Sequence, residues 1–108
     1  SNISAPSAET PVRTGGRTAN FTAATSTHYL VNTSGGAISI TTPAAPVAGD
    51  GFMITDVGNY CGSNYATCLT TAQKFHGAAN EFALTQNSGV ISIKYVDATQ
   101  GWVRVSDI

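Results

Sequence analysis

Charge is what this sequence lacks most. Only 10% of its 108 residues are Asp, Glu, Lys or Arg, against about 25% in an ordinary soluble domain. The five basic residues are scattered and the formal net charge is −1. No basic surface for nucleic acid or for an anionic membrane is therefore expected. The ion pairs that support exposed helices are scarce too, which disfavours a helical fold.

Long apolar runs and metal ligands are also scarce. No stretch approaches the roughly 20 apolar residues of a membrane-spanning helix, and no signal-peptide pattern is present. The chain begins SNISAPSAET, and a small first residue fits removal of an initiator Met. If Ser1 is native, synthesis in a cytoplasm is indicated. A zinc site needs four ligands, and only His28 and His76 could join the two cysteines. We therefore predict no metal and no other cofactor.

The two cysteines, Cys61 and Cys68, lie in the segment NYCGSNYATCLT, with six residues between them. This spacing allows a disulfide that closes a short loop and contributes about 2–3 kcal/mol. Two reduced thiols that behave as small apolar side chains explain the pair equally well. Both interpretations stay open at this point.

The sequence is rich instead in Thr, Ser, Asn, Gly and Ala, and its short segments alternate between apolar and polar residues. In AISITT, for example, Ile38 and Ile40 alternate with Ser39 and Thr41. This period of two predicts half-buried strands. The other predicted strands lie within residues 17–23, 27–33, 52–57, 68–77, 81–85, 90–96 and 101–105.

Turn sequences predict how these strands connect. SGG at 34–36 predicts a hairpin between 27–33 and 37–42, and QNSG at 86–89 predicts one between 81–85 and 90–96. The segment 41–56, TTPAAPVAGDGFMITD, contains prolines that end strand pairing and glycines that turn the chain. We interpret it as a crossing between two sheets.

About eight short strands separated by regular turns are typical of a small sandwich or barrel. We expect an all-β fold, a two-sheet antiparallel sandwich that is jelly-roll-like. Residues 17–108 would form this domain, and residues 1–16 an extended N-terminal arm. A Pro-, Ser- and Gly-rich arm is seldom ordered unless something holds it, so we expect it to contact another subunit. The predicted contact residues are Ile3, Pro6, Pro11, Val12, Arg13 and Arg17.

Catalytic patterns are weak. Cys61, His76 and Asp56 can be imagined as nucleophile, base and orienting acid, but no nucleophile motif surrounds them. Acid pairs such as Asp50 with Asp56, or Glu81 with Asp97, lack a cleft signature. We therefore expect a protein that is not an enzyme, and a small sugar-cleaving enzyme is the least favoured class.

The aromatic residues favour a core over a binding platform for sugars or bases, because most of them alternate along strands as core residues do. Tyr60 and Tyr65 differ, since they flank the loop around Cys61. We predict these two side chains as an exposed contact.

Taken together, Pro43, Pro46, the Gly49-Asp50 corner, the strand 90–96 and the ending GWVRV resemble small β domains of bacteriophage virion proteins. The likeness covers residues 29–105; the cysteine loop and the arm depart from it. It implies one of two roles. The first is a capsid decoration, or cement, protein on the outer surface of the head. The alternative is a receptor-binding tail-fibre or spike tip that attaches to a host surface receptor.

The resemblance also implies the partners and the location. A decoration protein would bind the major capsid protein and itself, as a dimer or trimer at a symmetry axis. It would be made in the host cytoplasm and reside on the virion. Neither nucleic acid nor a membrane is expected as a partner.

Overall fold

The computed structural model describes residues 7–8, 16–70, 72–78 and 81–107, which form strands and loops and contain no helix. Sheet A has the strand order β1 (Ser7–Ala8), β3 (Thr27–Val31), β5 (Gly51–Asp56), β8 (Val90–Asp97) and β9 (Gly101–Asp107). Sheet B has the order β2 (Phe21–Thr22), β4 (Ile38–Thr41), β6 (Ala66–Leu69) and β7 (Phe82–Leu84). The all-β expectation is confirmed.

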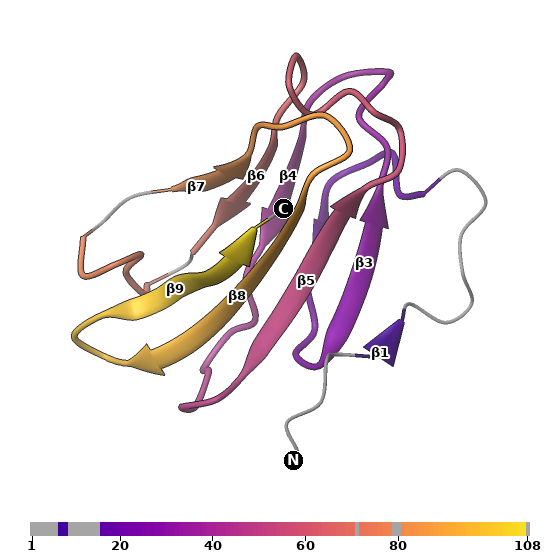
Figure 1. The fold of residues 1–108 in the computed structure, drawn as a ribbon. Coiled ribbons are helices and arrows are strands. Elements are labelled where there is room, and N and C mark those ends of the chain that lie inside the picture. The colour runs from indigo at the N-terminus through magenta and orange to yellow at the C-terminus, as the bar shows by residue number, and fades with distance from the viewer. Residues whose placement is uncertain (1–6, 9–15, 71, 79–80, 108) are drawn as a thin grey trace.

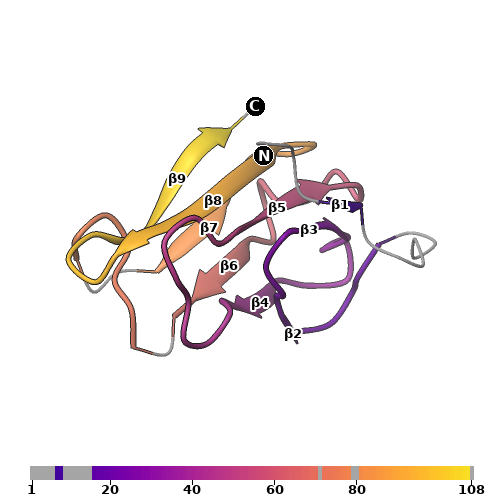
Figure 2. The same ribbon diagram turned by 90° about the horizontal axis from the view of Figure 1, so that it is seen from below.

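The two sheets form two layers around one core (Figures 1 and 2). Apolar residues at alternate positions of both sheets point into the space between them, as the period of two requires. Trp102 is fully buried, with its ring packed edge-on against Phe52 at 5.8 Å between ring centroids. The buried core residues are Ala23, Tyr29, Val31, Ile38, Ile40, Phe52, Ile54, Cys61, Ala66, Cys68, Phe75, Leu84, Ile91, Ile93 and Trp102.

Strand pairing differs from the expected antiparallel sandwich, because both sheets are mixed. β5 with β8, β8 with β9 and β6 with β7 are antiparallel. The pairs β1–β3, β3–β5, β2–β4 and β4–β6 are parallel. A jelly roll is built from antiparallel Greek keys. The two-layer arrangement agrees with the expected jelly-roll-like sandwich, but these four parallel pairs do not.

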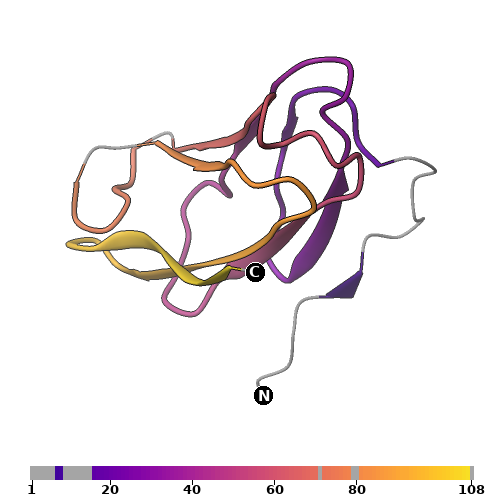
Figure 3. The same ribbon diagram turned by 45° about the horizontal axis from the view of Figure 1, so that its top comes forward.

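Both predicted hairpins are wrong, and the reason is the same for each. β3 lies in sheet A but β4 in sheet B, and β7 lies in sheet B but β8 in sheet A. The short segments 32–37 and 85–89 therefore cross between layers instead of folding one strand back on its neighbour (Figure 3). The interpretation of 41–56 as a crossing is confirmed, since it leads from β4 in sheet B to β5 in sheet A.

From β1 to β6 the chain changes sheet at every connection. It thus winds around the core and stacks β3 and β5 in one layer and β4 and β6 in the other, as a short β-solenoid does. Because stacked parallel strands run in one direction, their loops gather at the same two ends. β8 and β9 then fold back antiparallel and close the stack.

The first half of the outer edge of β9 is covered by residues 74–76 of the same chain. Trp102 donates its N–H to the carbonyl of Lys74 at 2.7 Å, and His76 donates to the carbonyl of Trp102 at 2.9 Å. The imidazole Nε2 of His76 accepts the N–H of Arg104 at 3.1 Å. This cover satisfies backbone groups that an open edge would expose to pairing with other chains.

Candidate functional site

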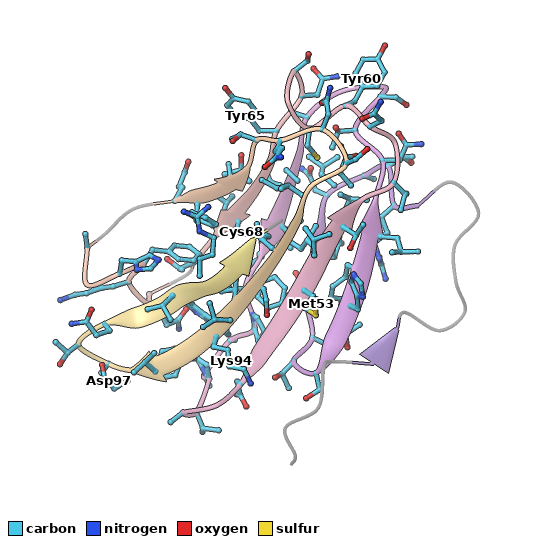
Figure 4. All side chains as sticks on the ribbon, viewed as in Figure 1. Met53, Tyr60, Tyr65, Cys68, Lys94 and Asp97 are labelled. Atoms are coloured by element: carbon cyan, nitrogen blue, oxygen red, sulfur yellow. The ribbon has the colours of Figure 1, made fainter. Side chains whose placement is uncertain are left out.

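Three loops meet at one end of the molecule because β3 and β5 end there while β4, β6 and β8 begin there. We call the surface formed by residues 32–37, 57–65 and 85–89 the apical surface. None of its residues is Asp, Glu, Lys or Arg, and Asn, Ser, Gly and Tyr predominate. It is the upper end of the molecule in Figure 4.

Tyr60 and Tyr65 lie on this surface, each with 48% of its side chain exposed. Both side chains point away from the body of the molecule (Figure 4). In the part of the chain that the structure describes, neither ring stacks against another aromatic ring. Their backbones are fixed, since the carbonyl of Tyr60 accepts the N–H of Asn64 at 2.8 Å and that of Tyr65 accepts the N–H of Ile38 at 3.2 Å.

Asp56 holds the longest apical loop in place from below. This carboxylate is 3% exposed and accepts hydrogen bonds from five backbone N–H groups. The donors are Gly58 (3.1 Å), Asn59 (3.0 Å), Tyr60 (2.9 Å), Cys61 (3.0 Å) and Ser88 (3.0 Å). Four of them belong to one turn, so the carboxylate fixes the backbone that carries Tyr60.

This geometry favours the ionised form of the Asp56 carboxyl group over its protonated form. Burial on its own acts to raise the pKa of the carboxyl group, because it penalises the charged form. The N–H donors of Cys61, Ser88, Tyr60 and Gly58 outweigh burial and hold the pKa of Asp56 below its ordinary value. The site therefore carries a buried negative charge whose acceptor oxygens are used by the protein backbone.

Side chains tie the three apical loops to one another. Asn87 accepts the N–H of Gly62 at 2.7 Å, and Asn64 donates its side-chain amide to the carbonyl of Thr33 at 2.8 Å. The hydroxyl of Ser88 donates to Oδ1 of Asn59 at 2.8 Å. Asn59 and Ser88 both have left-handed backbone angles, with φ of 60° and 56°, a conformation that often marks functional loops.

The two cysteines are free thiols in the structure, and both are fully buried. Cys61 lies in an apical loop, where the hydroxyl of Thr33 contacts its sulfur at 3.7 Å. Cys68 lies in β6 between the two layers. Burial raises the pKa of Cys61 to about 11 and that of Cys68 to about 12. Both thiols are therefore protonated and unreactive near neutral pH.

Arg17, expected to contact a partner, makes contacts within its own chain. Its guanidinium lies over the rings of Phe21 and Tyr29, at 4.5 and 5.1 Å from their centroids. Its backbone forms a parallel bridge with Val31. The other predicted arm contacts, Ile3, Pro6, Pro11, Val12 and Arg13, lie outside the described residues.

The residues considered for catalysis have structural contacts. His76 accepts the backbone N–H of Arg104 at the edge of β9, and His28 hydrogen-bonds Thr55 at 2.6 Å on the outer face of sheet A. Asp50 accepts the N–H of Val47 and Asp97 accepts those of Thr99 and Gln100, so each acid closes its own turn.

Among the described residues, no group of three or more His, Cys, Asp and Glu side chains is arranged to hold a metal ion. That part of the chain also contains no helix long and apolar enough to span a membrane.

A scan of the chain against protein-family models gives no match, and a comparison with curated protein sequences gives none either.

Proposed function

We propose that this chain is a non-enzymatic structural protein of a bacteriophage virion, which decorates the outer surface of the head and stabilises contacts between capsomers. The observation that supports this proposal most directly is the outer face of sheet A, which is broad and nearly uncharged. The resemblance of residues 29–105 to small virion β domains, proposed from the sequence, is compatible with this role and with the alternative of a tail tip.

The strand register defines that outer face. Leu30, Thr55 and Val90 lie side by side on β3, β5 and β8. The adjoining row is His28, Met53 and Ser92. All six side chains are half-buried in the isolated chain. Lys94 follows on β8, where Figure 4 shows it near the edge of the face.

Such a face suits burial against a neighbouring subunit. The centres of protein interfaces are depleted in charged residues, because a charge that loses its water costs free energy unless it is paired. The apolar side chains of Leu30, Met53 and Val90 gain from burial, and no charged side chain lies within the two rows. We propose the major capsid protein as the partner, with further copies of this chain around a symmetry axis.

A binding assay with undecorated phage heads tests this role. Purified protein is mixed with heads, and occupancy is measured by imaging and by particle mass. We expect stoichiometric binding, and strongly reduced occupancy for Met53→Lys. Thr67→Lys is the matched control, since Thr67 is also half-buried but lies on β6, on the outer face of sheet B. Full occupancy by the Met53→Lys protein would contradict the proposal.

The N-terminal arm is the second part of the proposal. Within it, Ser7–Ala8 adds to the edge of β3 as a parallel strand, and strand addition of this kind is a common way to join chains. We propose that the arm also contacts a neighbouring subunit. Deleting residues 1–16 should leave the core folded but lower head occupancy. Unchanged occupancy would contradict a contact between the arm and a neighbouring subunit.

A receptor-binding tip is the second candidate function, and the apical surface favours it. Two exposed tyrosines on loops tied together by hydrogen bonds form a pre-organised contact surface. This role predicts that the isolated protein adheres to host cells. Adhesion without head binding would favour the tip, and head binding without adhesion would favour decoration.

A further inference from the structure

We propose that the apical surface binds a neutral saccharide, with Tyr60 and Tyr65 as the aromatic contacts. The inference deepens the second candidate function, since it rests on recognition of a cell surface and names the chemistry recognised. Three properties of the surface favour such a ligand: exposed rings, absence of charge and fixed loops.

The exposed rings of Tyr60 and Tyr65 suit contact with a sugar. Tyrosine combines a flat apolar ring with a hydroxyl group, and it presents contact area at small entropic cost because few torsions need to be fixed. A sugar ring has an apolar face of C–H groups and a rim of hydroxyls, which complement the two parts of tyrosine. Tyr60 and Tyr65 are each about half exposed although large aromatic side chains are otherwise used in the core.

The absence of charge selects the class of ligand. Sulfated, phosphorylated or carboxylated ligands are bound mainly by Arg and Lys, and residues 32–37, 57–65 and 85–89 contain neither. The carboxylate of Asp56, beneath the surface, is buried and accepts hydrogen bonds from five backbone N–H groups. The exposed polar side chains are amides and hydroxyls, which both donate and accept hydrogen bonds as sugar hydroxyls do. They are Ser34, Asn59, Ser63, Thr85, Gln86, Asn87 and Ser88.

The fixed loops favour binding, because little ordering is left to occur when a ligand binds. Loops that order themselves only on binding lose free energy to that ordering, whereas pre-organised loops do not. Here Asp56 fixes the turn that carries Tyr60, while Asn64 and Asn87 tie that loop to its two neighbours. The composition also matches antibody combining loops, in which Tyr, Ser, Gly and Asn predominate.

The test is titration of the purified full chain with a panel of neutral oligosaccharides, such as glucans, galactans and mannans, followed by backbone amide NMR. We expect saturable binding by at least one of them, with shifts confined to residues 57–65 and the two adjoining loops. Tyr60→Ala and Tyr65→Ala should each weaken binding by roughly tenfold or more. Tyr60→Phe, which keeps the ring, should lose much less.

Val47→Ala is the control, because Val47 is 65% exposed but lies in the segment between β4 and β5, outside the apical surface. Thermal unfolding of each variant checks that the fold is intact. The inference is overturned if no neutral saccharide binds, if the shifts map elsewhere, or if sulfated or sialylated sugars bind in preference.

A parallel adhesion assay separates this inference from the function on which it rests. Adhesion to host cells that neutral oligosaccharides do not inhibit would sustain attachment and overturn the saccharide site, and would indicate a protein receptor. Saccharide binding without adhesion would sustain the site and overturn attachment.

Discussion

The carboxylate of Asp56 accepts the backbone N–H of Ser88 at 3.0 Å, across 32 positions of the sequence. This bond joins the end of β5 to the loop that leads into β8. Because the same carboxylate also fixes residues 58–61, one side chain determines the relative position of two apical loops. The shape of the candidate binding surface therefore depends on a buried acid that no ligand would touch.

Replacing Asp56 by Asn should destabilise the protein by about 3 kcal/mol or more, because a neutral amide is a weaker acceptor and its NH₂ group opposes backbone donors. Urea unfolding measures the change. Asp50→Asn is the control: Asp50 accepts the N–H of Val47 at 2.9 Å in a surface turn, so its loss should cost about 1 kcal/mol or less. Equal effects of the two substitutions would refute the special role of Asp56.

The contribution of Asp56 should also depend on pH. The folded-state pKa of Asp56 is lowered, so its stabilisation is complete above the unfolded-state value of about 3.9 and is lost as the pH falls through the folded-state pKa. The stability difference between the parent protein and Asp56→Asn should therefore shrink as the pH is lowered below about 4. Unfolding curves from neutral to strongly acidic pH measure it. A difference that stays constant with pH would contradict the assignment of charge.

Gly101 should not tolerate a side chain. Its φ is +72°, and a Cβ there would overlap the backbone of Lys74, which pairs with Trp102. Gly101→Ala is expected to cost about 2 kcal/mol or more, from the left-handed backbone and from displacement of the segment that covers β9. Gly35→Ala is the control, because no atom lies within 4 Å of the Cβ position and its effect should stay within about 1 kcal/mol. Thermal unfolding compares the two.

Cys61 and Cys68 should resist thiol reagents in the folded protein. Both are fully buried, and burial raises their pKa values to about 11 and about 12. We expect labelling at least about a hundredfold slower than that of a cysteine placed at Thr67, on the outer face of β6. Labelling by a disulfide reagent, with and without denaturant, measures this. Fast native labelling of either thiol would show that its surroundings open readily.

Most strands could be predicted from the sequence, but their partners could not. The predicted segment 68–77 is an exception, because the observed strand β6 is Ala66–Leu69. Alternation placed Ile38 and Ile40 inside, and the observed β4, Ile38–Thr41, lies within the predicted segment 37–42. A period of two identifies the buried face of a strand and says nothing about its neighbour. The turn at 34–36 satisfies a hairpin and a crossing between sheets equally well. Only packing of the whole chain decided that it crosses.

The candidate site, too, could be predicted from the sequence only in part. A polar, glycine-containing loop carrying Tyr60 and Tyr65 could be identified from composition, because such a segment forms neither a strand nor a helix. The role of Asp56 could not be identified, since four of its donors lie two to five residues away but the fifth is Ser88. An acid at the end of a buried strand, two residues before the Gly58-Asn59 pair, was the available local signal.

The sequence by itself determined the all-β fold, the alternation that builds the core and the uncharged character of the surface, because these follow from local residue type. Tertiary structure decided the parallel stacking of strands, the pairing of Arg17 with its own core and the gathering of three loops above Asp56. These depend on contacts between distant segments, whose free energies are set only when both sheets close around one core.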